Sequence, residues 1–482
     1  MKLRQSVSMA GESGAAILTR HVLDGPGLRG VTLLAFATLC SCAQVDARPD
    51  FERARDLITE STGTSAVYDP GASPLTSDEI AALLRDGLSL EEASRLALLN
   101  NRDLQRDFME IGVSRAQWVQ SGLLANPTLD LLVRLPSGGG RAFLEATLAQ
   151  SLLDIWRIPL RREIAREHLE ATVLRIARRA GELLAEVRVA YSEAIAGDEQ
   201  AAIAAGKVDL LQSSLDAVRD LREAGAATDL DLSQALTEKL QADAELERLQ
   251  LEALQAKRRI ARLLSLEQDT AEIALLGKLP EEGSIDLVPE EMIRTARAVR
   301  LDLRAYTAAV RALESSLGLE KSRSWGDIAL GPSVERPAEG ATLAGGGLSV
   351  TLPLFDQNQA QVAEQRFLLE QTVKSYEAVA LSLAQDIRTA LDRARTASRL
   401  VQFHREQLLP AAERSLAQAQ ERFTLGDTNL LALLESQRSL LGAKGEFVRA
   451  RLDLARALAE LELAVGEPLS RRVRGSENGA PP

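Results

Sequence analysis

Four short segments of the chain alternate between apolar and polar side chains with the period of two that is typical of a β-strand. In residues 128–135 the side chains of Leu129, Leu131 and Val133 share one face, and Asp130 lies on the other. The same alternation recurs in residues 143–152, 327–336 and 348–354, and it is least regular in 327–336. Each segment has about ten residues, enough for a tilted strand to cross a bilayer. A soluble hairpin with one buried face would show the same alternation.

The segments around these strands follow the helical period instead. A helix is predicted before each strand pair, over about 89–122 and 289–322. After the first pair, nothing interrupts the helical pattern from residue 160, just past Pro159, to Arg222, which corresponds to roughly 90 Å at 1.5 Å per residue. Helices of this length cannot fold back onto a globular core, so they indicate elongated helical hairpins.

The second long helix is predicted from Asp356 to about Leu425. Asp356 should be its N-cap, with Gln359 as the capping partner three residues later. Pro410 should kink this helix, because proline lacks the backbone N–H that the helical ladder needs.

The return helix of each hairpin carries a seven-residue repeat, which imposes coiled-coil packing. In the helix predicted over 430–466 one seam position holds Leu433, Leu440, Phe447, Leu454 and Leu461. The other seam position, three residues further on, is mostly Ala. The first return helix repeats this pattern from Leu232 to Leu263. Small side chains on one seam allow neighbouring helices to approach closely.

Both hairpin tips use the same capping chemistry. Gly225 and Gly426 are placed to end the outgoing helices in the left-handed conformation that glycine adopts at low cost. Three residues later Thr228 and Asn429 are placed to cap the return helices. Asp231 follows Thr228 at the third helical position, which completes a capping-box pair.

The chain is a tandem repeat, because its landmarks recur about 200 residues apart. Arg102-Asp103-Leu104 corresponds to Leu301-Asp302-Leu303, and the tip glycines Gly225 and Gly426 also correspond. The predicted organisation is a lipoprotein signal peptide (1–41), an N-terminal periplasmic segment (42–88), a first repeat (89–276, strands about 127–152, tip about 223–229), a linker (277–288), a second repeat (289–466, strands about 327–354, tip about 424–430) and a disordered tail (467–482).

The N-terminus has the features of a targeting segment. Basic residues precede the nine-residue apolar run 31–39, which is too short to span a bilayer and fits a signal-peptide core. The run ends in Leu39-Cys40-Ser41-Cys42, which resembles a bacterial lipobox, so Cys42 is the expected lipid-attachment residue. An ordinary signal peptide with two incidental cysteines is the alternative, and Met9 is a second possible start. No other run of eighteen apolar residues occurs.

Composition excludes several classes of protein. The 482 residues carry a net charge of −12 without a basic patch, which argues against a nucleic-acid partner. Three His and two Cys are too few for zinc sites or thiol redox pairs, so no cofactor or metal is expected. Aromatic residues make up only 3% of the chain, which suits packed Ala/Leu helices better than a compact enzyme core.

The order of these features resembles the TolC-type family of outer-membrane efflux channels over residues 80–467, nearly all of the chain that follows the signal peptide. The motifs that carry the resemblance are Leu123-Leu-Ala-Asn-Pro127, Thr351-Leu-Pro-Leu-Phe-Asp356, Gly225-x-x-Thr228-x-x-Asp231 and Arg422-Phe-x-x-Gly426. The family implies a mainly α-helical homotrimer with a small β part. Its twelve strands form one outer-membrane barrel, which continues as a periplasmic α-helical barrel.

The resemblance also implies partners and a location. A periplasmic adaptor (membrane fusion protein) and an inner-membrane pump, expected to be proton-driven, complete the system, and the barrel lies in outer-membrane lipid. Trp156 and Trp325 flank the strands where an interfacial aromatic girdle would lie. Four strands leave two open edges that lipid cannot satisfy, so physical chemistry separately requires several chains. The chain is thus interpreted as a passive exit duct for efflux, or for type I secretion.

Three other classes of protein share some of these features. An enzyme is disfavoured because His168 and His404 lie on separate helices without a neighbouring motif. Gly138–Gly140 and Gly345–Gly347 lack the GK[ST] sequence of a phosphate loop. A periplasmic adaptor has one hairpin flanked by β domains, whereas this chain has two hairpins. A structural coiled-coil lipoprotein would not need paired amphipathic strands at matching places.

The family's periplasmic entrance is ringed by acids six and nine positions after the second tip glycine. Those positions hold Ala432 and Glu435, so Glu435 is the candidate entrance residue. Asp231 keeps the family's acid at the first tip, but its basic partner is replaced by Thr428. A helix cap for Asp231 and a solvated helix face for Glu435 are the alternatives. The motif Gly122-Leu-Leu-Ala-Asn-Pro127 resembles the heavy-metal efflux branch of the family slightly more than its other branches, but the sequence does not identify the exported substrate.

Overall fold

The computed structural model describes residues 44–73, 75–135, 137–138, 141–267, 273–281, 285, 287–338, 340–425 and 430–469. The predicted signal peptide, Cys42, Gly426, Asn429 and nearly all of the predicted tail lie outside the described residues. The chain divides between Asp46 and Ala47 into two units, and every element below belongs to the second.

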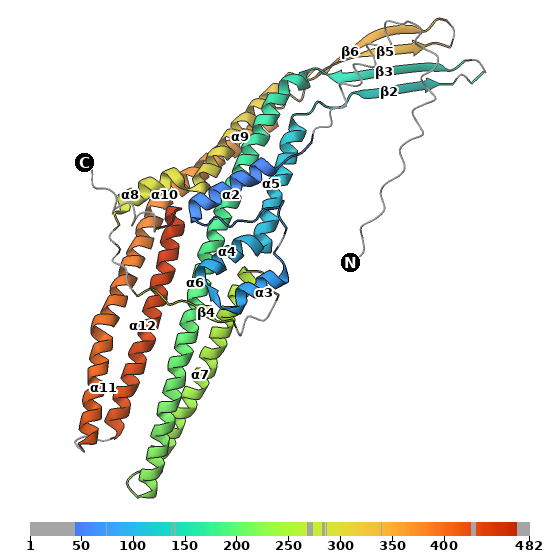
Figure 1. The fold of residues 1–482 in the computed structure, drawn as a ribbon. Helices are drawn as coiled ribbons and strands as arrows, with labels where there is room; N and C mark the ends of the chain where they lie inside the picture. The colour runs from blue at the N-terminus through green and yellow to red at the C-terminus, as the bar shows by residue number, and fades with distance from the viewer. Residues whose placement is uncertain are drawn as a thin grey trace. The chain divides into compact units, whose positions relative to one another are not determined.

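The second unit is built from two copies of one plan, which confirms the predicted repeat (Figure 1). The first copy consists of α4 (Leu90–Asn100), α5 (Arg102–Ser121), β2 (Thr128–Arg134), β3 (Phe143–Ser151), α6 (Leu153–Glu223) and α7 (Asp229–Leu263). The second consists of α8 (Pro289–Val299), α9 (Leu301–Arg323), β5 (Ile328–Arg336), β6 (Leu343–Val350), α10 (Gln359–Phe403), a π-helical turn (His404–Leu408), α11 (Leu409–Thr424) and α12 (Leu430–Val465). Hairpin 1 denotes α6 and α7, and hairpin 2 denotes α10 to α12.

The helices predicted over 89–122 and 289–322 are each two helices, so that prediction was wrong in both copies. The chain turns extended at Asn101 (φ −60°, ψ 118°) and at Arg300 (φ −60°, ψ 123°). Asn101 caps α5 by accepting from the Leu104 N–H, and its amide donates to the Leu263 carbonyl at the end of α7 at 2.8 Å. Arg300 donates likewise to the Ala464 carbonyl near the end of α12. Each break therefore supplies polar groups to the end of a return helix.

The four strands form one antiparallel sheet in the order β2-β3-β5-β6, so the two copies meet at β3 and β5. The bounds of β2, β3 and β5 agree with the predicted strands to within one residue. The fourth strand was predicted over 348–354 and lies earlier, at Leu343–Val350. The alternation continues past Val350, but Pro353 has no N–H to extend the ladder.

The long outgoing helices differ in continuity. The helix α6 runs unbroken for 71 residues and includes Pro159 in its second turn. In hairpin 2 the predicted cap at Asp356 was wrong: α10 starts at Gln359 after Asn358, which has φ +60°. The Asp356 carboxylate instead accepts from the Asn358 N–H at 2.9 Å. The predicted interruption at Pro410 is present as the π-helical turn just before it.

The return helices α7 and α12 pack along their own outgoing helices, and the predicted seams are confirmed (Figure 1). No seam side chain of either helix is exposed, and Ala443, Ala450 and Ala457 are buried. At Gly197 an added Cβ would lie 2.9 Å from the Cα of Ala253, so α6 and α7 approach closely there. None of the described helices combines the length and apolarity needed to cross a membrane.

The N-terminal segment packs onto the middle of α6. It contains α2 (Arg48–Thr62), α3 (Ser77–Arg85) and the short strand β1 (Leu88–Ser89), which pairs in parallel with β4 (Leu275–Leu276). The Tyr191 hydroxyl of α6 lies 2.7 Å from the Leu88 carbonyl and 2.5 Å from that of Leu276, and burial raises the pKa of Tyr191 to about 12. A neutral hydroxyl thus fixes both strands to α6.

Candidate functional site

The sheet presents one apolar face that is open to its surroundings in the single chain. The register places Leu129 opposite Leu148 and Leu330 opposite Leu348, all on this face. Other members of the apolar face are Leu131, Val133, Leu144, Ala146, Ile328, Val334, Ala344 and Val350, and two polar side chains, Gln150 and Arg336, lie on it as well. Leu131 is 68% exposed and Leu348 is 67% exposed, although both are apolar. A contiguous exposed apolar face of this kind marks contact with a partner or a membrane.

The opposite face of the sheet carries most of its acidic side chains. It holds Asp130, Arg134, Glu145 and Glu335 together with the apolar Leu132, Phe143 and Leu343, and the register places Glu145 directly opposite Glu335. Like charges opposite one another weaken a sheet unless water screens them. A mainly apolar face opposite one that holds most of the acidic side chains is the pattern of a strand that separates lipid from a water-filled lumen.

The two tryptophans that were predicted to lie at the membrane interface are found where the sheet meets the helices. Trp156 is 72% exposed near the start of α6, and Trp325 is 82% exposed just before β5. Arg157 beside the first donates to the Gly326 carbonyl at 2.6 Å and so ties α6 to the turn that contains the second. Gly326 has φ +76°, and a Cβ there would overlap the Thr351 carbonyl oxygen, so this turn requires glycine.

The tip of hairpin 1 has the predicted geometry. Gly225 has φ +74°, and Thr228 forms a capping box with Asp231 at the start of α7. The hydrogen bonds from the Thr228 hydroxyl and N–H lower the pKa of the Asp231 carboxyl. Arg222 pairs with Asp229 across the turn at 2.6 Å. Asp231 is therefore engaged as a helix cap.

Glu435 lies near the start of α12 and is 68% exposed. Its carboxylate is 3.3 Å from Arg438, which also donates to Glu238 of α7 at 2.7 Å. Sequence reasoning did not single out Glu238 or Arg438. They lie 200 residues apart, at nearly equivalent places in the two copies. A search for opposite charges at the repeat spacing could have identified this pair from the sequence. The pair connects hairpin 1 to hairpin 2.

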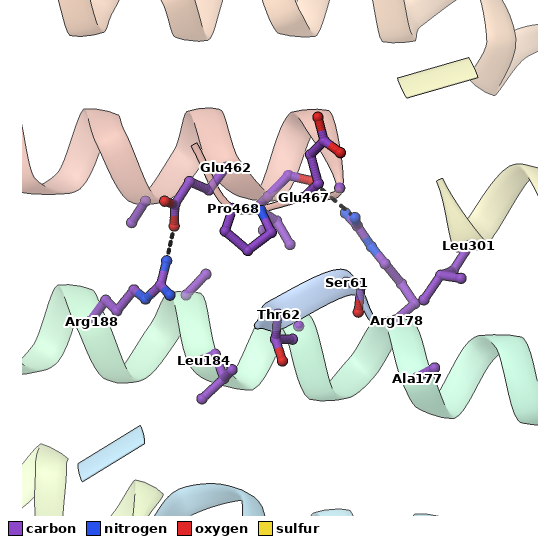
Figure 2. Close-up of a pocket in the computed structure, with 15 residues that line it drawn as sticks. Ser61, Thr62, Ala177, Arg178, Leu184, Arg188, Leu301, Glu462, Glu467 and Pro468 are labelled. Carbon is purple, nitrogen blue, oxygen red and sulfur yellow. Dashed lines mark hydrogen bonds and ion pairs between the residues drawn. The ribbon is translucent and has the colours of Figure 1, made fainter. Parts of the chain in front are cut away.

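Charged side chains also connect the hairpins further from the tips. Figure 2 shows Arg188 of α6 pointing at Glu462 of α12, with which it forms an ion pair, beside a small cavity of about 50 Å³. Arg178 of α6 donates to the Leu463 carbonyl at 3.0 Å across the same cavity. A space of this size holds no more than a water or two, so the cavity is a gap in helix packing.

Comparisons with known proteins agree with this architecture. The family model described as "Outer membrane efflux protein" matches residues 93–265 and 292–467. The cobalt-zinc-cadmium resistance protein CzcC of Cupriavidus metallidurans is 25% identical over 374 residues, which cover 74% of this chain and 85% of CzcC. The outer membrane protein OprJ of Pseudomonas aeruginosa is 26% identical, with 91% of this chain and 95% of OprJ covered.

The fold is similar to that of solved outer-membrane channels. The structure of the channel OprN superposes with a TM-score of 0.65 at 22% identity, covering 84% of this chain and 95% of OprN. At this identity the likeness establishes the shared fold.

Proposed function

The chain belongs to the outer membrane efflux protein family, and from this membership we infer that it is the outer-membrane exit duct of an efflux system. It lies in the outer membrane and extends into the periplasm, where it receives substrate from the inner-membrane components. Its family is one of transport proteins, and the duct conducts passively, with the energy supplied elsewhere.

The observation that carries this function is the two-faced sheet joined to two long helical hairpins. The apolar face has the composition that lipid requires, and the charged face can line an aqueous passage. Strand β3 leads into the 71-residue helix α6 after a single residue, so the wall of the passage is covalently continuous from membrane to hairpin tip.

We propose a homotrimer. Among the described residues the outer strands β2 and β6 each have one partner strand, so each leaves a row of backbone groups without a described strand beside it. Lipid cannot satisfy those groups, and four strands are too few to close a barrel. Three chains would contribute twelve strands and join β2 of one copy to β6 of the next.

The proposed partners are a periplasmic adaptor and a proton-driven inner-membrane pump. The tips are the proposed adaptor contacts, through Gly225 and Thr228 of hairpin 1 and Gly426 and Asn429 of hairpin 2. The metal-resistance relative CzcC supports a divalent metal as the exported class, as does the motif at 122–127. The pump, rather than this chain, would select the substrate.

Cys42 is the proposed lipid-attachment residue. Acyl chains alone give marginal membrane binding, so the barrel should hold the protein in the membrane without them. Labelled palmitate should enter the native chain and not the Cys42→Ser variant. Equal labelling of both would contradict the assignment.

Chemical cross-linking in outer-membrane preparations tests the duct and its assembly together. We expect a ladder that ends at the trimer, and purified trimer should form conducting pores in planar bilayers. Monomers alone, under conditions in which a trimeric porin of the same membrane cross-links fully, would contradict the homotrimer. Trimers that conduct no ions would contradict the duct.

A further inference from the structure

Each repeat has a groove at the same place, where its first helix packs on its long outgoing helix (Figure 1). Groove 1 lies between α4 and α6, is also lined by α12 and by the segments 62–66 and 276–280, and has a volume of about 1100 Å³. Groove 2 lies between α8 and α10 and has a volume of about 570 Å³. Ligand pockets in proteins measure roughly 300–1,000 Å³, so both grooves have room for a ligand.

The two grooves share an arginine at the same position. Arg95 of α4 corresponds to Arg294 of α8 at the repeat spacing of about 200 residues. Each lies four residues after a glutamate, Glu91 or Glu290, which also lines its groove. A glutamate in the first helical turn stabilises the helix, and an arginine four residues later can pair with it. The structure describes all four residues, and neither arginine forms this ion pair. Pairing within the helix therefore does not account for either arginine.

Groove 1 has more positive charges than carboxylates. Arg95 and Lys278 are exposed, and neither forms an ion pair with any residue that the structure describes. The third cation, Arg188 of α6, pairs with Glu462 of α12 beside the small cavity that Figure 2 shows. The other oxygen of Glu462 accepts from the Leu469 N–H at 3.2 Å. Both oxygens of this carboxylate are thus engaged, and the two exposed cations are left without an anion.

Groove 2 is more strongly cationic. It is lined by Arg294, Arg297 and Arg388 and by one acid, Glu290. Arg294 and Arg297 are exposed and form no ion pair within the described part of the chain. Arg388 lies 3.8 Å from Glu290 and its side chain is 45% exposed, so this is a weak surface pair. The chain as a whole carries a net charge of −12, so the grooves are local exceptions that attract anions.

The walls of groove 1 suit an extended peptide better than a small anion. Two non-helical segments contribute to it, and the backbone N–H groups of Ser65 and Lys278 make no hydrogen bond to any described residue. Ile195, Leu276 and Leu458 give it apolar surface as well. Successive side chains of an extended peptide point to opposite sides, so acidic ones can reach the cations while apolar ones contact this surface. The main-chain carbonyls of such a peptide would accept from the two N–H groups.

We propose that both grooves bind an extended acidic peptide segment of another periplasmic protein. Arg95 and Lys278 hold its carboxylates in groove 1, and Arg294 and Arg297 hold them in groove 2. The preferred segment alternates acidic and apolar residues, since groove 2 also offers the apolar Ile293 beside its arginines. This inference goes beyond the duct, because neither groove includes a strand of the four-stranded sheet or a hairpin tip.

Fluorescence anisotropy of a labelled peptide tests the grooves on the full-length protein in a neutral detergent. The probe is rhodamine-labelled Gly-Glu-Leu-Glu-Leu-Glu-Gly, and the matched peptide carries Gln in place of each Glu. We expect the Glu peptide to bind about tenfold more tightly, because its carboxylates form charge-assisted hydrogen bonds with the cations. Raising the salt concentration from about 50 to about 300 mM should weaken its binding, since exposed charges are screened.

Two double variants separate the grooves. Arg95→Gln with Lys278→Gln should abolish binding in groove 1, and Arg294→Gln with Arg297→Gln should abolish it in groove 2. Each double variant should lower the number of Glu peptides bound per chain from two to one. All four side chains are exposed, so the substitutions leave the packing of the helices intact.

The matched control is Arg414→Gln with Lys444→Gln, which removes two exposed cations of α11 and α12 that line neither groove. It should leave binding of the Glu peptide unchanged. Equal affinity for the Glu and Gln peptides, or an equal loss of binding in the control and in the groove variants, would overturn the proposal. Full displacement of the peptide by an equal concentration of glutarate would also overturn it, since a small dicarboxylate would then suffice. Failure of the protein to conduct in bilayers would contradict the duct alone.

Discussion

Thr228 is the residue whose local role is best defined. Its hydroxyl accepts from the Asp231 N–H at 3.2 Å and donates to the Asp231 carboxylate at 2.6 Å. Thr228→Ala should remove about 1 kcal/mol of capping, so amide exchange over the first turn of α7 should rise about fivefold. Hydrogen–deuterium exchange of the intact trimer measures this. Thr237→Ala, further along the same helix and hydrogen-bonded only locally, is the control.

The same cap has a defined pH dependence. Because the folded pKa of Asp231 is lowered by Thr228, the stabilisation is complete above the ordinary carboxyl pKa of 3.8 and is lost as pH falls through the lower folded value. Protection of this turn, corrected for intrinsic exchange, should therefore be equal at pH 5 and pH 7. A marked loss of protection at pH 5 would show that another group controls the tip.

Glu435 leads to a different prediction, since it is exposed and faces Arg438 rather than a backbone cap. If three copies converge around an entrance, their carboxylates attract multivalent cations. Hexamminecobalt added on the periplasmic side should block single-channel conductance, and Glu435→Ala should weaken this block about tenfold. Glu446→Ala, which also removes a carboxylate from α12, serves as the comparison. Unchanged block in Glu435→Ala would place Glu435 away from the passage.

Residue roles that depend on adjacent sequence were predictable, and those that depend on packing were not. The left-handed Gly225 and the Thr228 cap follow from four neighbouring residues, and the structure confirms both. The cap at Asp356 was misplaced because Asn358 is also close to the helix start and tolerates φ +60°. Glu238–Arg438 joins two helices 200 residues apart, so local pattern contained no sign of the pair.

Among the elements, the sheet depends most sharply on one glycine. A Cβ at Gly331 would overlap the Leu148 carbonyl oxygen of β3. Gly331→Ala should therefore force β3 and β5 apart and cost about 1–3 kcal/mol. The trimer band on detergent gels should dissociate at a lower temperature. Gly345→Ala in β6, where a Cβ would be 3.7 Å from the Ser333 hydroxyl, should leave that temperature unchanged.

Strand and helix types were predicted correctly, and errors arose at element ends. Alternation located β2, β3 and β5, but it could not show that pairing stops at Val350. Helical periodicity continued through Asn101 and Arg300, where the chain breaks to reach the ends of α7 and α12. Both errors have one cause, because an element ends where its hydrogen-bond partners end, and those partners are distant in sequence.

At the scale of the whole molecule, the position of the membrane can be tested with the three tryptophans. Trp156 and Trp325 are exposed, whereas Trp118 lies between Arg115 and Arg162 at 4.4 and 4.8 Å. In single-tryptophan variants reconstituted into brominated lipid, the first two should be quenched at least about twofold more than Trp118. Equal quenching of all three would mean that the sheet ends do not mark the interface.

The order of helices, strands and hairpins could be predicted from the sequence because the chain is a tandem repeat. Matching landmarks fixed the number of strands and hairpins, and oligomerisation followed from counting strand edges. The strand order and the junction of the two copies at β3 and β5 were not predicted, since alternation shows which face a residue occupies but not which strand lies beside it.

That junction also sets the order in which the protein can be made. Strands β3 and β5 pair residues roughly 180–190 positions apart, whereas β2–β3 and β5–β6 are neighbours in sequence. At synthesis rates of 5–20 residues per second, the later strand emerges roughly 10–40 s after the earlier one. The apolar face of the first strand pair must remain unjoined throughout that delay. The sheet can therefore be completed only after the second repeat has been made.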